Sequence, residues 1–196
     1  EKAKFVVEPK IDGLSVVLHY RDGMFVQGAT RGDGEVGEDI TSNLRTIRAI
    51  PLRIPVESES QKSKVESHRP STFDLRPPKY LVVRGEAFIP NKEFEELNRK
   101  LEEAGEKTYL NPRNTAAGSL RQLDPQLTAS RPLTLLIYQI VYSEGGKVPT
   151  SQWEILEYLK ALGFPVTNVA RRFNNLESAI AYTETWNEGR DKLSYE

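Results

Sequence analysis

The sequence predicts an α+β fold, with mainly antiparallel sheets and flanking helices. Two observations carry this prediction. The β-type runs Leu14–Tyr20 and Met24–Thr30 are joined by Arg21-Asp22-Gly23, and Asp-Gly is a strong hairpin turn signal. The later strands and helices lack the regular βαβ alternation of a parallel sheet. At 196 residues and 38% hydrophobic content, the chain fits one domain with a real core.

The first part of the chain is expected to contain the hairpin, a strand that leads into it and a short helix. The leading strand is the apolar run Phe5-Val6-Val7-Glu8-Pro9. After the hairpin come a glycine-rich acidic stretch, 31–39, and a short helix around Ile40 to Thr46, and Pro51 ends this region. From Val56 to Pro78 the chain is rich in Ser, Glu, Lys and Pro, which predicts a flexible surface insertion.

Order is expected to return with a buried strand from Tyr80 to Ile89. Asn91 then caps a predicted helix that Gly105 ends. Its core-facing stripe consists of Phe94, Leu97, Leu101 and Ala104. The stretch 109–124 is polar and predicts a loop with a short helix.

The C-terminal part predicts one more strand, from Leu133 to Tyr142, and two helices. Ser151 and Glu154 form a capping box for a helix that continues to Leu162. A last helix is expected from Leu176 to about Asn187.

Composition excludes several classes of protein. The chain has no cysteine, which excludes a disulfide scaffold and a Cys-based zinc site within it. The two histidines, His19 and His68, argue against a histidine metal site or a His-based triad. A net charge of −1 gives no overall attraction to nucleic acid, so DNA contacts need local arginine clusters. No stretch reaches membrane-spanning length and no signal peptide is present, so we expect a cytoplasmic protein without membrane contact.

The segment Lys10-Ile11-Asp12-Gly13 places an amine nucleophile among carboxylates. If the segment is extended, Glu8, Lys10 and Asp12 share one face and Ile11 points the other way. A lysine, with a reference pKa of about 10.4, attacks an electrophile only when burial, a cation or a metal favours its neutral form. Because the carboxylates do the opposite, a nucleophilic Lys10 needs a divalent ion or cationic neighbours. The alternative is a strand-end lysine that is paired with Asp or Glu.

Other candidate site residues each have a structural alternative. Glu86, two residues after Arg84 on a buried strand, needs a cation or ligand, and a salt bridge would satisfy it. Arg113 and Arg121 could bind phosphate, although a single arginine is more often simply solvated. Tyr138 could offer its ring to a nucleobase, or could be an ordinary core tyrosine.

The pattern Gly32-x-Gly34-x-x-Gly37 matches the fingerprint of dinucleotide-binding folds, but its context argues against that function. The preceding strand belongs to a hairpin, whereas the fingerprint requires a βαβ crossover. Asp33 and Glu35 would also repel phosphate. The acidic residues do not follow the spacing of a calcium-binding loop. We therefore expect a flexible acidic turn that leads into a helix.

Several segments match one known family in order and in length. They are Glu8–Gly13, Ala29–Gly34, Gly37–Asn43, Arg45–Pro51, Val83–Glu86, Asn111–Asp124 and Arg131–Leu133. Together they resemble the adenylation domain of bacterial NAD-dependent DNA ligases, over nearly the whole chain except the insertion from Val56 to Pro78. The resemblance implies a nucleotidyltransferase fold of the kind shared by DNA ligases and mRNA capping enzymes.

The resemblance also implies a reaction. Lys10 would attack the α-phosphate of NAD and form lysine-AMP. AMP would pass to the 5′-phosphate of nicked double-stranded DNA, and the nick would then be sealed. NAD and Mg²⁺ or Mn²⁺ are the implied cofactors, and DNA replication and repair in the bacterial cytoplasm the implied roles. An ATP-dependent polynucleotide ligase and a non-catalytic nucleotide- or DNA-binding relative remain alternatives.

The resemblance assigns roles to individual residues. The catalytic residues would be Lys10 and Asp12, and a metal ion would be held by Asp12 and Glu86. Nucleotide-binding residues would be Glu8, Ile11, Gly13, Arg31, Glu86, Arg113 and Tyr138. DNA-binding residues would be Arg121 and Arg190.

The chain departs from the family at its end. In the family, a D-G-V-V-x-K strand and a further lysine motif follow the segment that resembles Gly189–Lys192, whereas this chain stops at Glu196. We therefore expect residues 1–196 to be a C-terminally incomplete adenylation domain of a monomeric enzyme, without its N-terminal and C-terminal partner domains. Such a piece is expected to be inactive alone, because the absent lysines would neutralise phosphate charge.

Overall fold

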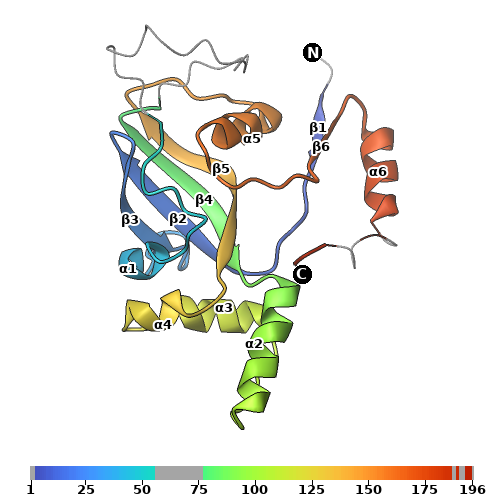
Figure 1. The fold of residues 1–196 in the computed structure, drawn as a ribbon. Coiled ribbons are helices and arrows are strands. Elements are labelled where there is room, and N and C mark those ends of the chain that lie inside the picture. Colours follow the sequence, from blue (N-terminus) through green and yellow to red (C-terminus); the bar gives the residue numbers. More distant parts are fainter. Residues whose placement is uncertain (1–2, 56–76, 187–188, 190–192, 196) are drawn as a thin grey trace, which may run out of the picture.

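The computed structural model describes residues 3–55, 77–186, 189 and 193–195, and it confirms an α+β fold (Figure 1). The described part contains a four-stranded and a two-stranded sheet, both antiparallel. The strands are β1 (Phe5–Val7), β2 (Leu14–Arg21), β3 (Met24–Thr30), β4 (Tyr80–Phe88), β5 (Thr134–Glu144) and β6 (Arg171–Phe173). The helices are α1 (Thr41–Leu44), α2 (Asn91–Glu103), α3 (Pro112–Leu120), α4 (Pro125–Ala129), α5 (Gln152–Ala161) and α6 (Leu176–Thr185).

The larger sheet has the strand order β3-β2-β4-β5. Its register places Ser15 of β2 and Leu136 of β5 on either side of Glu86 of β4. The β4–β5 ladder shifts between Arg84 and Gly85, so that Tyr138 has no partner in it. Such bulges can change the direction in which a side chain points.

One face of this sheet carries the hydrophobic core. The core side chains from the strands are Val16, Leu18, Tyr20, Phe25, Leu81, Val83, Ala87, Leu135 and Ile137. They pack against side chains from the α1 region, α3 and α5, namely Ile40, Leu44, Ile47, Ile50, Ile54, Leu120, Tyr158, Leu159, Leu162 and Phe164. The opposite face carries the polar side chains Ser15 and Glu86, because side chains alternate along a strand.

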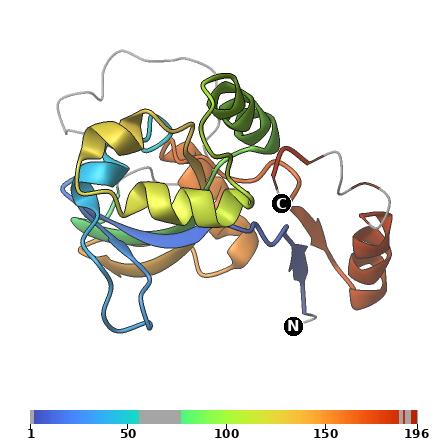
Figure 2. The ribbon, with the colours of Figure 1, turned by 90° about the horizontal axis from the view of Figure 1, so that it is seen from below.

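The two-stranded sheet lies to one side of the larger one, together with α6 (Figures 1 and 2). Strand β1 pairs with β6, and residues 8–13 then cross from β1 to the start of β2. The predicted nucleophile segment is therefore the link between two sheets rather than part of an extended strand.

The predicted helix after the fourth strand forms, but two details of the prediction are wrong. Asn91 is the first helical residue, and Pro90 occupies the cap position without a side-chain hydrogen bond. The apolar stripe is not core, because no α2 residue is fully buried and Ala104 is exposed. Figure 1 shows the reason, since α2 projects away from the body of the protein.

Two short elements were not predicted. Strand β6 has only three residues, and it forms by pairing with β1, which is far away in the sequence. Helix α4 starts with an Asp124 cap and Pro125 in the first turn, a local signal that the sequence did offer. Positions 56–76 of the predicted flexible insertion, Val56 to Pro78, lie outside the described residues.

Helix α1 is held to the end of α3 by a buried asparagine. The Asn43 Nδ2 group donates to the Leu120 carbonyl at 2.9 Å and to the Gln122 carbonyl at 2.8 Å. Asn43 is 6% exposed and Leu120 is fully buried, so at least the bond to the Leu120 carbonyl is shielded from water. Among the described residues, no helix is long and apolar enough to cross a lipid bilayer.

We predict that Asn43→Ala lowers the free energy of unfolding by about 2 kcal/mol, because the substitution leaves polar groups without partners in a poorly solvated position. Urea denaturation measures the change. Gln122→Ala is the control, since that exposed side chain donates to the Gly118 carbonyl of the preceding turn, and its effect should stay within about 0.5 kcal/mol. An equally small effect of Asn43→Ala would contradict the prediction.

Candidate functional site

A cavity of about 710 Å³ lies where the 8–13 link meets the large sheet and α3. Sites for small-molecule ligands usually enclose about 300–1,000 Å³. The predicted site residues that line the cavity are Glu8, Lys10, Ile11, Gly13, Arg31, Glu86, Arg113, Arg121 and Tyr138. Asp12 lies outside this lining, and Arg190 lies outside the described residues. Ile11 shares the cavity with Lys10, so the expected alternation along an extended segment is wrong.

Gly13 fixes the path of the link across the sheet. A Cβ atom at this position would overlap the Ala87 carbonyl oxygen of β4, so only glycine allows the two backbones to come so close. The Gly13 N–H also donates to the Glu86 carboxylate, and this bond favours the ionised carboxylate. The link, and Lys10 within it, are thereby held against β4.

Arg113 connects the link to the first turn of α3. Its Nη1 atom lies 2.8 Å from Oδ1 of Asp12. The helix start that carries Arg113 is fixed by Asn111, whose side chain accepts the Asn114 N–H at 2.9 Å. Arg113 therefore has a defined position at the cavity wall, with Asp12 as its carboxylate partner.

Glu86 lies close to two cations of the cavity, Arg113 and Lys10. Burial raises the pKa of the Glu86 carboxyl, the charges of Arg113 and Lys10 oppose that rise, and the nearby Asp12 adds to it. The salt bridge that was the structural alternative for Glu86 does not involve its strand neighbour Arg84. The Arg84 guanidinium instead donates to Gln139 Oε1 at 3.3 Å.

Glu8 and Tyr138 form another part of the cavity wall. Burial raises the pKa of the Glu8 carboxyl, and a hydrogen bond of 2.8 Å from the Gln152 side chain partly opposes the rise. The Tyr138 hydroxyl lies 3.4 Å from the Ser15 hydroxyl. A carboxylate and an aromatic ring that face one cavity suit a flat ring with hydrogen-bond donors.

Arg121 and Arg31 line the cavity where α3 ends and β3 ends. Arg121 Nε lies 2.7 Å from Glu38 Oε2, and the two side chains are 52% and 61% exposed. The backbone N–H of Arg31 donates to the Ser15 carbonyl, and this bond holds the backbone of Arg31 beside β2. An exposed ion pair contributes only about 0–1 kcal/mol, so a phosphate group could replace Glu38 as the partner of Arg121 at little cost.

The glycine-rich stretch after β3 is a compact turn rather than a dinucleotide-binding loop. The Asp33 side chain accepts the N–H groups of Glu35 and Val36 at 2.9 and 2.8 Å. Gly32 has a φ of +56°, and a Cβ there would overlap the Val36 carbonyl oxygen. The chain then returns along β3, where Thr30 N–H donates to the Glu38 carbonyl, and no crossover helix follows. The prediction of an acidic turn that leads into a helix is thus confirmed as to the turn and the helix, and its flexibility stays a prediction.

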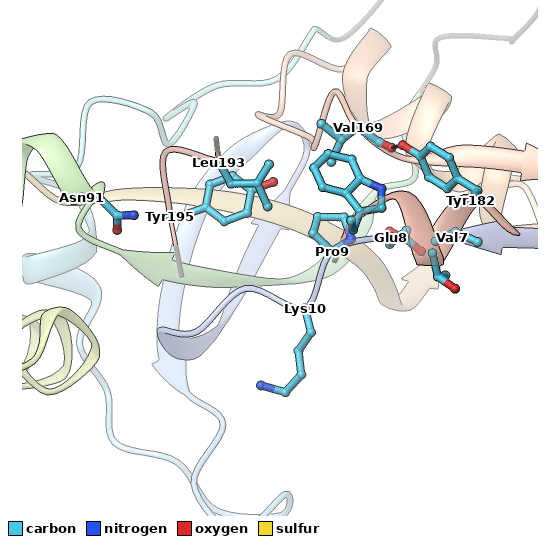
Figure 3. Close-up of a pocket in the computed structure, with 11 residues that line it drawn as sticks. Val7, Glu8, Pro9, Lys10, Asn91, Val169, Tyr182, Leu193 and Tyr195 are labelled. Atoms are coloured by element: carbon cyan, nitrogen blue, oxygen red, sulfur yellow. Dashed lines mark hydrogen bonds between the residues drawn. The ribbon is translucent and has the colours of Figure 1, made fainter. Parts of the chain in front are cut away.

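A second cavity, of about 640 Å³, lies on the other side of the link. Both cavities include Glu8, Pro9 and Lys10, and the second is completed by Tyr182 and Tyr195, among others. Figure 3 shows the Lys10 side chain extending away from these aromatic rings. The amine therefore belongs to the first cavity, and the link forms a wall between the two.

Protein ligands for a metal ion are few. Within the described ranges, no three His, Cys, Asp or Glu side chains come together in a way that could hold an ion. Asp12 is near enough to Glu86 for its charge to raise the pKa of the Glu86 carboxyl. The two carboxylates could supply two oxygen ligands to an ion whose remaining ligands are water or phosphate.

Several residues that line the cavity were not predicted from the sequence. Asn114 and Ala117 line the cavity together with Arg113 and Arg121. Their helical spacing could have identified them, since positions four apart share a helix face. Gln152 carried no such signal, because its bond to Glu8 spans 144 positions of the sequence.

Comparisons with known proteins agree on one family. The family described as the NAD-dependent DNA ligase adenylation domain matches residues 1–196. A DNA ligase of Chloroflexus aurantiacus (strain J-10-fl) is 52% identical over 192 residues, which are 98% of this chain and 26% of that protein. A DNA ligase of Myxococcus xanthus is 48% identical over 192 residues, with the same coverage of 98% and 26%. One of Pelotomaculum thermopropionicum is 46% identical over 204 residues, which cover 100% of this chain and 27% of that protein. The chain thus spans about a quarter of the length of these relatives.

We predict that Arg113→Gln raises the pKa of Glu86 further above its ordinary value, because the substitution removes a charge that stabilises the carboxylate. In ¹³C NMR titrations of the glutamate carboxyls, the Glu86 midpoint should move to higher pH. Arg121→Gln is the matched control, since Arg121 is paired with Glu38, and the midpoint should stay in place. An unchanged midpoint in Arg113→Gln would show that this charge does not act on Glu86.

Proposed function

This chain belongs to the family of NAD-dependent DNA ligase adenylation domains, and from that premise we propose that its cavity binds NAD and that Lys10 takes AMP from it. The observation that carries the proposal is the position of Lys10. Its amine belongs to a cavity that also contains a half-buried carboxylate, Glu86, and a guanidinium, Arg113, that is paired with Asp12. Glu8 and Tyr138 supply a place for the adenine ring in the same cavity.

The proposed chemistry begins with a neutral Lys10 amine. The Nζ lone pair attacks the α-phosphorus of NAD, an N–P bond forms, and the bond from that phosphorus to the bridging oxygen breaks. Nicotinamide mononucleotide leaves with the oxygen, and AMP remains on Lys10 as a phosphoramidate. The 5′-phosphate of nicked DNA then takes the AMP, and the 3′-hydroxyl displaces AMP as the strand is joined.

The side chains around Lys10 would hold the nucleotide during this step. Arg113 and Arg31 suit the phosphate oxygens, because a guanidinium donates two hydrogen bonds in a planar fork. Glu8, Ile11 and Tyr138 would contact the base. Gly13, with its N–H on Glu86, keeps Lys10 beside the carboxylate that is proposed to face the ribose and the metal.

A magnesium or manganese ion fits the donor set of this site. Such ions in phosphate-transfer sites are usually held by one or two carboxylates, together with phosphate oxygens and water. Asp12 and Glu86 would be those carboxylates. When bound, the ion would neutralise charge on the phosphates that approach Lys10.

We extend the proposal to the whole protein by analogy with relatives of about four times this length. It would be a monomeric bacterial ligase of replication and repair in the cytoplasm, with further domains that help to bind nicked DNA. Arg121 would contact the DNA backbone, and the same role is proposed for Arg190. The arrangement of the two sheets is compatible with the nucleotidyltransferase fold of ligases and capping enzymes, which we propose as its fold.

We predict that the full-length protein, given NAD and Mg²⁺, gains the mass of one AMP group on Lys10. Intact-mass analysis and peptide mapping measure this. Lys10→Arg should abolish the gain, because a guanidinium keeps the charge but is not a nucleophile at neutral pH. Lys4→Arg, outside the cavity, should leave it unchanged.

An active protein with an unmodified Lys10 would contradict the mechanism. Parallel reactions with NAD and ATP, each labelled in the α-phosphate, separate the two classes of ligase. Transfer of label from ATP and none from NAD would contradict the proposed substrate.

A further inference from the structure

One side chain outside the predicted site connects two of its walls. Gln152 Nε2 donates to Glu8 Oε2 at 2.8 Å and to the Tyr138 carbonyl at 2.9 Å. Glu8 follows β1 of the small sheet, whereas Tyr138 lies at the bulge of β5 in the large sheet. Both amide hydrogens are used, so the nitrogen of the carboxamide, and not its oxygen, must face Glu8.

Gln152 has a rigid support. It is the first residue of α5, whose start is capped by Ser151, and the Ser151 hydroxyl donates to Glu154 Oε2 at 2.7 Å. The rest of α5 is fixed in the core through side chains such as Leu159. Glu8, by contrast, stands on a link that follows a strand of only three residues. The helix therefore determines where the Glu8 carboxylate is held.

We propose that Gln152 is a positioning residue that sets base specificity: it holds the Glu8 carboxylate as a hydrogen-bond acceptor beside Tyr138, so that the cavity selects a 6-amino purine over a 6-oxo purine. This inference rests on the proposed function. It adds to that function a residue, Gln152, and a stated discrimination between two bases.

The chemistry of the two bases explains the selection. The exocyclic amine of adenine donates a hydrogen bond, which an ionised Glu8 can accept. A 6-oxo purine presents an acceptor there, and two acceptors repel each other unless the carboxyl is protonated. Because burial raises the pKa of Glu8 and the bond from Gln152 opposes the rise, Gln152 keeps more of the carboxyl in the accepting form.

Other charged groups also face the two cavities that Glu8 borders. They are Lys10, Arg31, Glu86, Arg113 and Arg121, with Tyr138, Tyr182 and Tyr195 as the titratable phenols. The pKa of Glu8 is nevertheless shifted by its burial and by the Gln152 hydrogen bond. Removal of the carboxamide should therefore have a direct effect on that pKa.

The test uses the full-length protein with NAD and with nicotinamide hypoxanthine dinucleotide, its 6-oxo analogue. The measured quantity is kcat/KM for the appearance of AMP, or of its hypoxanthine counterpart, on Lys10. Gln152→Met keeps the length of the side chain without its donors. It should reduce the preference for NAD by about tenfold, the usual effect of one hydrogen bond to a charged group, and should move the acid limb of the NAD pH profile to higher pH.

Two further variants make the result specific. Gln152→Glu places an acceptor and a second carboxylate beside Glu8, so it should also reduce the preference and move the limb in the same direction. Glu154→Gln changes the same helix start at an exposed side chain without touching Glu8, and should leave both measurements unchanged. Thermal denaturation checks that each variant is folded, and Gln152→Glu decides the matter if Gln152→Met does not fold.

Three outcomes are informative. Loss of preference together with the shifted limb supports the inference. Lower activity with the preference and the limb unchanged overturns it, since a merely structural role would produce that result. If wild-type Lys10 acquires no nucleotide from either compound, the proposed function itself fails, and the role of Gln152 fails with it.

Discussion

The close approach of Gly13 to β4 is the constraint on which the site depends. Since a Cβ atom would overlap the Ala87 carbonyl oxygen, the link can cross the sheet at this level only with glycine. The same residue donates its N–H to Glu86, so one backbone position fixes both the path of the link and a carboxylate of the cavity. That contact also determines where Lys10 and Asp12 lie. Lys10 then lies on the side of the large sheet, and Asp12 within reach of Arg113.

Two of the cations of the site are held in ion pairs with carboxylates. Arg113 is paired with Asp12 on the link, and Arg121 with Glu38 on the turn after β3. This pairing accords with a chain of net charge −1, and it means that the two cations are already oriented before any phosphate arrives. A phosphate that approaches either arginine must compete with a carboxylate. Selectivity for a ligand therefore depends on geometry more than on attraction over distance.

Local signals in the sequence were sufficient for some parts of the structure and not for others. The hairpin and the Ser151 cap of α5 follow from adjacent residues, and both are found where they were predicted. Strand β6 and the contact of Gln152 with Glu8 could not be predicted, because each depends on a partner more than 140 positions away in the sequence. The stripe of α2 had the right period, but period alone does not show whether a helix packs on the body or projects from it. For the cavity, the residue types in the motifs pointed to the chemistry, and the fold determined which of them meet.

The two half-buried carboxylates of the site affect the stability of the fold. Burial raises the pKa of both Glu8 and Glu86 above the ordinary value of 4.5. Each group therefore stabilises the fold most below that ordinary value, where it is protonated, and this contribution is lost as the pH rises through the raised folded-state pKa. When they ionise, both carboxylates lie in surroundings that solvate them less well than water does. Gln152 on one and Gly13 with Arg113 on the other compensate only in part. A ligand that brings a donor to Glu8, or positive charge to Glu86, would supply the missing partner. A ligand that binds to either carboxylate would thus stabilise the fold as well.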